Sequence, residues 1–404
     1  MARRISIALV LSLLVVAFLA MSVGAAQKPV EKRQVLNPLI NKVETYAFPD
    51  EHDFSVSTGR VVPTQSLGGT QSLAVSPGVK VGETWYDYQR NGSMRRMINW
   101  GWGPDLGDGE VYGFAVHFTY MQLPAPVLED RHMYYNVYMG QDGIQLQPGL
   151  GEPVQVPGEY AGYGGLDMTQ TLRTATGDPS DTIQAPNSAV IVCHNNQGAG
   201  YASQVYYDDG PMWAYFAPTS RVPDSVQSYP ALSGKEAIWP AMRYHDVPGN
   251  PPVTHVIAQT SEENAADPQS IYYFRKVGVG IEGAWDYPPY VIDTIYDLTQ
   301  DVACSMTDGK MALVWTGNLP NAGDCDTCSG TSTIHVQLDN DVYYQISDNY
   351  GADFNPRVNV TKNVDGEAGY RCYTDLTALI TQDALNGVNA LHIGWSGRVW
   401  PADA

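Results

Sequence analysis

The chain has 404 residues and a formal net charge of −20, and only 16% of its residues are charged. A chain this acidic repels phosphate backbones and anionic lipid surfaces, which argues against nucleic-acid and membrane-surface partners. Its 26 tyrosines, 39 glycines and 27 prolines favour short strands joined by turns.

The N-terminus has the pattern of a secretory signal. Two arginines precede an apolar run over Ile5–Ala20, and small residues follow at 24–26. The run is shorter than the about 20 residues that span a bilayer, so we predict a signal peptide over residues 1–26. We expect a secreted or cell-surface protein with no transmembrane segment in the mature chain. Residues 27–80 lack periodicity and are interpreted as a linker or extension before a domain at 81–404.

Paired tyrosines recur along the rest of the chain, and the gaps between successive pairs are 72, 66 and 71 residues. The pairs are Tyr134-Tyr135, Tyr206-Tyr207, Tyr272-Tyr273 and Tyr343-Tyr344. An apolar, β-branched run precedes each pair, and turn residues separate the runs. Four short strands per period without crossover helices predict an all-β fold, a β-propeller of four-stranded antiparallel blades. A β-solenoid is disfavoured because its coils are much shorter than about 70 residues.

The period predicts four complete blades and part of a fifth. The complete blades are expected near residues 95–160, 161–225, 229–295 and 297–361. The fifth unit supplies two strands before Ala404, and two interpretations stay open. Residues 84–93 would close the ring by pairing with 390–400, or the chain is a fragment of a longer protein. We favour the fragment, because two strands alone leave an exposed edge.

A turn motif interrupts the stretch VYYQISDNYGADFNPRVNVT, residues 342–361. The motif is Ser347-x-Asn349-x-Gly351-x-x-Phe354. It resembles the Asp box, S-x-D-x-G-x-x-W/F, which lies between the third and fourth strands of blades in the BNR-repeat, sialidase-like propellers. We expect the Asx side chain to cap backbone amides, the glycine to take a positive φ, and the aromatic ring to pack under the sheet.

The resemblance implies the fold more strongly than an activity. Sialidases use three arginines to hold a carboxylate, a tyrosine assisted by a glutamate as nucleophile, and an aspartate as acid and base. No Arg-Ile-Pro tripeptide occurs here, and the arginines do not share a repeated position. No catalytic residue carries over. We therefore expect a non-catalytic module that binds a glycan, polymer or extracellular protein. A sialidase-like glycoside hydrolase and a structural module of a larger cell-surface protein are the alternatives.

The densest polar stretch on an inner strand is RYHDVPGN. Its first four residues, Arg243, Tyr244, His245 and Asp246, are predicted to form a ligand-contacting loop.

Histidines and aspartates also recur at matching places in the repeat. The histidines are His117, His255 and His392, and the aspartates are Asp167, Asp297 and Asp375. Shared packing explains the histidines better than a ring of metal ligands does. A turn cap explains the aspartates better than a site for Ca²⁺ or sugar hydroxyls. We predict neither a metal nor a cofactor.

Five cysteines permit disulfides in an exported chain. Cys325 and Cys328 form a C-x-x-C in a loop rich in glycine and aspartate. A structural zinc needs four ligands, and no second pair of this kind exists, so we favour a loop-stapling disulfide. The other three are interpreted as buried small residues or unpaired thiols: Cys193, Cys304 and Cys372.

Overall fold

The structure is a computed structural model, and all residues that it describes belong to one compact unit, Leu67–Ala404. They are 81–86, 96–102, 114–124, 131–139, 151–154, 160–169, 172–174, 182–184, 188–196, 201–208, 216–219, 222, 236–260, 269–281, 283–295, 299–318, 340–364, 369–382 and 389–400. The predicted signal peptide, the linker and the Cys325–Cys328 pair lie outside these ranges.

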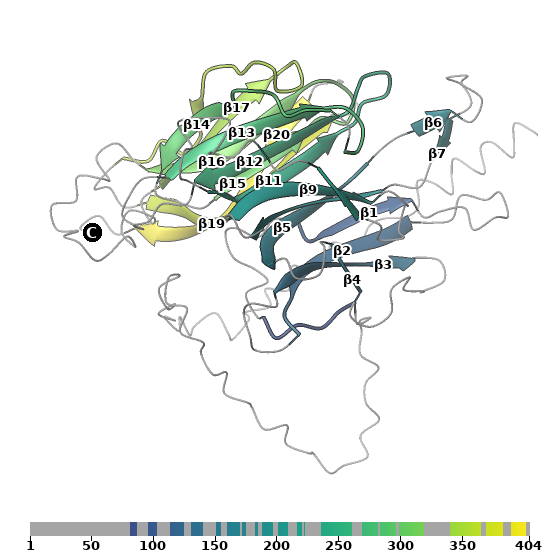
Figure 1. Ribbon diagram of the computed structural model, residues 1–404. Coiled ribbons are helices and arrows are strands. Elements are labelled where there is room, and N and C mark those ends of the chain that lie inside the picture. Colours follow the sequence, from purple (N-terminus) through teal and green to yellow (C-terminus); the bar gives the residue numbers. More distant parts are fainter. Residues whose placement is uncertain are drawn as a thin grey trace, which may run out of the picture. The chain divides into compact units, whose positions relative to one another are not determined.

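The described residues form strands and turns and contain no helix, so the predicted all-β class is confirmed. The first sheet has four antiparallel strands in the order β1-β2-β3-β4 (Figure 1). Its strands are β1 (Ile98–Trp102), β2 (Phe114–Gln122), β3 (His132–Met139) and β4 (Glu152–Pro153).

The next sheet has eight strands, made of two antiparallel groups of four. The first group is β5 (Tyr160–Met168), β8 (Ala189–Asn196), β9 (Tyr201–Asp208) and β10 (Phe216–Pro218). The second is β11 (Ala237–His245), β12 (Val253–Thr260), β13 (Gln269–Val277) and β14 (Tyr290–Ile295). One parallel pairing, between Ala237 of β11 and Ala202 of β9, joins the groups. A separate hairpin consists of β6 (Leu172–Thr174) and β7 (Thr182–Gln184).

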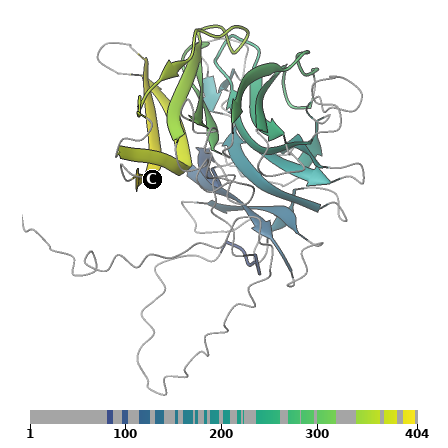
Figure 2. The same cartoon turned by 90° about the vertical axis from the view of Figure 1, so that its left-hand side faces the viewer.

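The remaining strands form a four-stranded and a two-stranded antiparallel sheet. They are β15 (Gln300–Cys304), β16 (Met311–Asn318), β17 (Asn340–Ser347) and β18 (Val358–Asn359), followed by β19 (Gly369–Gln382) and β20 (Asn389–Trp400). In the turned view the long β19 and β20 are the yellow strands beside the yellow-green β17 (Figure 2). The expectation of four-stranded antiparallel units is therefore met.

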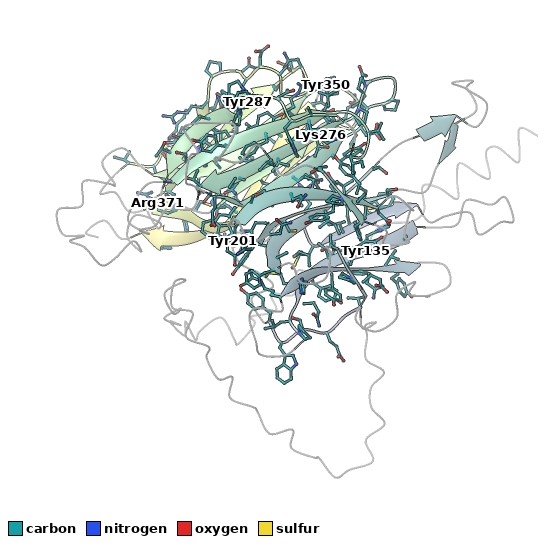
Figure 3. All side chains as sticks on the ribbon, in the orientation of Figure 1. Tyr135, Tyr201, Lys276, Tyr287, Tyr350 and Arg371 are labelled. Carbon is teal, nitrogen blue, oxygen red and sulfur yellow. The ribbon has the colours of Figure 1, made fainter. Side chains whose placement is uncertain are left out.

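Consecutive groups of strands pack face to face through four apolar cores. Each core takes residues from one group and from the next along the chain. In β8, for example, Ile191 and Cys193 enter the core shared with β2 and β3, whereas Val190 and Val192 enter the core shared with β11 and β12. Alternate side chains of a strand point to opposite faces, so a strand buried on both faces reads as a continuous apolar run. The side chains in Figure 3 fill the space between neighbouring groups.

The first strands of three groups share a backbone irregularity. Tyr163 in β5, Trp239 in β11 and Asp375 in β19 have positive φ angles of 49°, 51° and 61°. A register shift in the pairing with the second strand accompanies each of them. Such bulges bend a strand and redirect its side chains. The repeat therefore extends to the backbone of these strands.

The turn between β17 and β18 is closed by the side chains of the Ser-x-Asn-x-Gly motif. Ser347 Oγ accepts hydrogen bonds from the backbone N–H of Asn349 (3.3 Å) and of Gly351 (2.9 Å). Asn349 Oδ1 accepts one from the N–H of Asp353 at 3.0 Å. The ring of Phe354 packs edge-on against Tyr273, with centroids 5.1 Å apart. The motif thus ties its own sheet to β13.

We predict that Gly351→Ala destabilises the protein by about 3 kcal/mol, because two effects add. Gly351 has a φ of +75°, which costs alanine about 1 kcal/mol. A Cβ there would also overlap the Tyr273 hydroxyl and lie 2.8 Å from Met311 Sδ, and overpacking costs about 1–3 kcal/mol. Gly249→Ala is the matched control, because φ is +84° and no atom lies within 4 Å of the added carbon. Equal losses in urea unfolding would contradict the packing argument.

Candidate functional site

Charged side chains of different groups, from their first strands or just before them, form two ion pairs. Asp167 of β5 lies 3.6 Å from Arg243 of β11, measured from Oδ1 to Nη1. Arg96, just before β1, lies 3.5 Å from Asp301 of β15, measured from Nη2 to Oδ2. Both carboxylates are buried. This inner network is defined by these four residues.

Asp167 and Arg243 also bind backbone groups of the next first strand. Asp167 Oδ2 accepts a hydrogen bond from the N–H of Tyr244 in β11 at 2.9 Å. Arg243 Nε donates to the carbonyl oxygen of Val302 in β15 at 3.0 Å. Asn99 of β1 adds a hydrogen bond from Nδ2 to Asp167 Oδ1 at 3.0 Å. One side chain from each group therefore fixes the position of the next group.

Asp301 and Arg96 continue this pattern to β19 and back to β1. Asp301 Oδ2 accepts the N–H of Ala378 in β19 at 2.8 Å. Arg96 Nη2 donates to the carbonyl oxygen of the same alanine at 2.7 Å, and the Arg96 backbone carbonyl accepts the N–H of Leu166 in β5. The inner network therefore links β1, β5, β11, β15 and β19 in one series of contacts.

Burial changes the proton affinity of Asp167 in the inner network. Burial raises the pKa of Asp167 from 3.8 to about 6, and the Arg96 guanidinium offsets part of that rise. Removing a carboxylate from water penalises its charged form. The geometry thus keeps a titratable carboxyl group at the centre of the contacts between strands.

The four residues predicted as one ligand-contacting loop are divided between the two faces of β11 and the turn after it. Arg243 joins the inner network, and Tyr244 is buried against Tyr207 with ring centroids 5.8 Å apart. His245 is buried as well, and Asp246 follows the strand. Alternate residues of a strand point to opposite faces, which separates neighbours in the sequence. They do not form one exposed loop.

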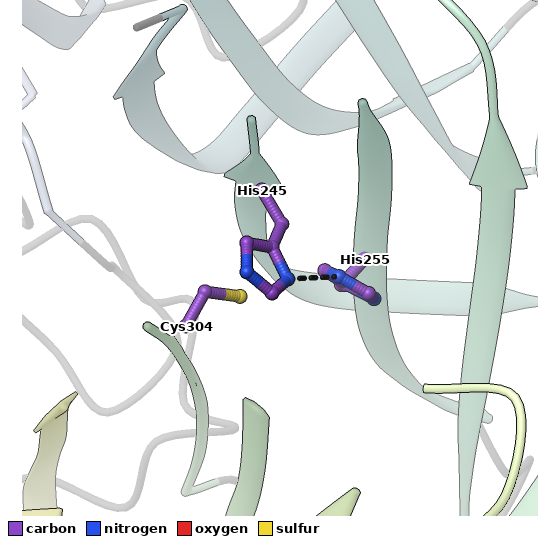
Figure 4. A group of neighbouring side chains, drawn as sticks. All are labelled: His245, His255 and Cys304. Carbon is purple, nitrogen blue, oxygen red and sulfur yellow. Dashed lines mark hydrogen bonds between the residues drawn. The ribbon is translucent and has the colours of Figure 1, made fainter. Parts of the chain in front are cut away.

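His245 instead belongs to a histidine–thiol cluster with His255 of β12 and Cys304 of β15 (Figure 4). His245 Nδ1 and His255 Nε2 lie 3.3 Å apart, and the three potential donor atoms are all within 4.8 Å of one another. The ring of Tyr350 packs on His245, with centroids 4.8 Å apart. Burial lowers the pKa of both imidazoles and raises that of the thiol. Both rings are therefore neutral at physiological pH.

Sequence reasoning missed this cluster. The residue pattern predicts Cys304 to be a buried small residue or an unpaired thiol, and His255 to share a packing environment with two other histidines. The three histidines lie apart: His117 bonds Tyr135, His255 bonds Tyr273 and the exposed His392 bonds Thr381. One feature could have indicated the cluster. His245 is the last residue of β11 and Cys304 is the last residue of β15, and these are the first strands of two consecutive units.

The matching aspartates do not gather either. Asp167 is in the inner network, Asp375 accepts a hydrogen bond from Ser396 Oγ at 2.9 Å, and Asp297 lies outside the described residues. Thr84–Tyr86, the described part of the segment predicted to close the ring, contacts the first sheet and β5. Its Trp85 N–H donates to the Leu123 carbonyl at 3.0 Å. Residues 87–93 lie outside the described ranges.

No known protein family matches this chain, and no curated protein matches it. In the part of the chain that the structure describes, no helix has both the length and the apolar character needed to cross a bilayer. The functional argument therefore rests on the sequence and on the geometry of the described strands.

We predict that Asp167→Asn removes part of the pH dependence of stability. The folded state holds the Asp167 proton more tightly than the unfolded chain does, so deprotonation opposes folding, and stability falls as the pH rises from 3.8 to about 6. At 1.36 kcal/mol per pKa unit, the wild type loses about 2–3 kcal/mol relative to the variant over this interval. Denaturant unfolding of both proteins across pH measures the difference. Parallel curves would contradict the assignment.

Proposed function

We propose that the groups of strands are blades of a β-propeller and that the protein is an exported, non-catalytic binding or scaffolding module. Its ligand would be a glycan, a polymer or an extracellular protein. The order of the inner-network contacts supports a radial arrangement. The contacts run from β1 to β5, from β5 to β11, from β11 to β15, from β15 to β19, and from β19 to Arg96 before β1. Face-to-face packing of consecutive groups supports it as well. The signal-like N-terminus supports export.

The observation that carries the non-catalytic part is the use of the inner carboxylates. Glycoside hydrolysis needs one carboxyl group as acid and a second as nucleophile or base, both facing the substrate. Asp167 and Asp301 face backbone amides and guanidinium groups instead. The guanidinium groups of Arg96 and Arg243, which a sialidase-like enzyme would need to hold a substrate carboxylate, are paired with these aspartates. The inner network therefore favours a structural role.

The connection between β13 and β14 is a described surface with several exposed apolar side chains. Val279, Ile281 and Tyr287 are 64%, 49% and 56% exposed. Tyr287 is labelled in Figure 3. The loop is nevertheless fixed, because Lys276 Nζ donates to the Gly280 carbonyl at 2.7 Å and Trp285 is buried. A rigid apolar surface loses little conformational entropy on binding, which favours affinity.

We predict that the triple variant Val279→Asp, Ile281→Asp and Tyr287→Ser weakens binding to any ligand identified on a glycan and extracellular-protein panel. Loss of exposed apolar anchors typically costs more than about 1.4 kcal/mol, which is at least tenfold in Kd. Val364→Asp is the control, because Val364 is 53% exposed and lies after β18, away in the sequence from the β13–β14 connection. Equal affinity of the triple variant and the Val364→Asp variant for a ligand would show that the β13–β14 connection does not bind it.

We also predict no turnover of fluorogenic glycosides, sialosides included, by the purified protein. Asp301→Asn should lower the melting temperature, because it weakens the contacts of Asp301 with β19 and Arg96. Hydrolysis that is abolished by Asp167→Asn or Asp301→Asn in a folded variant would support the enzyme alternative.

A further inference from the structure

We propose that His245 Nδ1, His255 Nε2 and Cys304 Sγ form a binding site for a transition-metal ion, with Zn²⁺ as the best-matched ion. The three residues come from β11, β12 and β15, so the site joins two consecutive groups of strands. Figure 4 shows the sulfur and the His255 ring directed toward the His245 ring.

The spacing of the donor atoms suits a tetrahedral ion. Zinc bonds of about 2.0–2.1 Å to nitrogen and about 2.3 Å to sulfur place ligand atoms about 3.3–3.6 Å apart in tetrahedral geometry. The two histidine nitrogens already lie 3.3 Å apart. The sulfur is within 4.8 Å of both nitrogens, and metal binding would bring it closer. Three protein ligands leave one position of the ion for water or another ligand.

The outer nitrogens of both rings are held by oxygen atoms, as in many histidine–metal sites. His245 Nε2 lies 2.8 Å from the Asp308 carbonyl oxygen. A carbonyl only accepts, so this nitrogen carries the proton and Nδ1 presents its lone pair to the cluster. His255 Nδ1 lies 2.6 Å from Tyr273 Oη. These contacts fix the orientation of both rings.

Tyr273 allows His255 to present its lone pair too. Its hydroxyl donates to Met311 Sδ at 3.6 Å, which leaves the oxygen to accept the proton on His255 Nδ1. Both inner nitrogens then have lone pairs facing each other, an arrangement that a cation between them stabilises. Without a cation, the tyrosine donates to Nδ1 and Nε2 donates to His245. When the metal–sulfur bond forms, the Cys304 thiol releases its proton to solvent.

The first sheet contains a histidine–tyrosine pair equivalent to His255 and Tyr273. His117 and Tyr135 repeat the contact, with Nδ1 and Oη 2.6 Å apart, and His117 Nε2 is buried with no hydrogen-bond partner among the described residues. The histidine–tyrosine pair is therefore a packing element of the repeat. His245 and Cys304 surround the inner nitrogen only in the later sheet. Imidazole and thiolate ligands select zinc and other late transition metals over Ca²⁺ or Mg²⁺.

The test is titration of the chelator-treated, reduced full chain with Co²⁺, followed by competition with Zn²⁺. We expect one ion per chain and a thiolate-to-cobalt absorption band that Zn²⁺ removes. Cys304→Ser should lose the band, and His245→Gln or His255→Gln should weaken Co²⁺ binding at least tenfold. Tyr273→Phe should weaken it about 10–100-fold, because it removes the oxygen that holds His255 Nδ1.

Matched variants separate a site from a packing effect. His117→Gln and Tyr135→Phe alter the equivalent pair and should leave Co²⁺ binding unchanged, with circular dichroism confirming that every variant is folded. Absence of a band in the folded wild type would overturn the proposal. A band that survives Cys304→Ser, or that disappears only when Cys325 and Cys328 are both replaced by serine, would overturn it too.

Discussion

The hydrogen bond from the Tyr244 N–H to the Asp167 carboxylate is the contact on which the arrangement of the strands depends most. It joins β5 to β11, and the same carboxylate also contacts Asn99 of β1 and Arg243. A buried charge is tolerated only when it is paired and hydrogen-bonded, and removing one partner from such a pair typically costs about 3–5 kcal/mol. The network therefore stabilises one placement of the groups of strands and disfavours others.

Much of the fold was predictable from the residues. Units of four short strands are indicated by apolar runs such as AVIVC in β8, by the recurring tyrosine pairs and by the turn residues between them, because local sequence pattern determines strands and turns.

The site was not predictable in the same way. His245 and Cys304 belong to different units, and the packing of β11 on β15 brings them together. Arg243 looked available for a ligand because its partner, Asp167, lies in an earlier unit.

The two histidine–tyrosine pairs indicate how a repeat architecture acquires a site. In the first sheet no described residue forms a hydrogen bond with His117 Nε2. In the later sheet the His245 imidazole and the Cys304 thiol lie beside the equivalent pair, His255 and Tyr273. Repeats conserve packing geometry, so one unit changes its chemistry while the others retain the fold. We propose that a partner binds the exposed β13–β14 connection and that a metal ion joins two groups of strands at the histidine–thiol cluster.

We infer that the inner network holds the first strands in one arrangement. Hydrogen exchange of the Tyr244 and Ala378 amides, resolved by fragmentation mass spectrometry, tests it most directly, because both amides donate to network carboxylates. We predict that both amides exchange only through global unfolding. The free energy of exchange should then equal the free energy of unfolding measured in denaturant. Exchange of either amide through local opening, at a much smaller free energy, would contradict it.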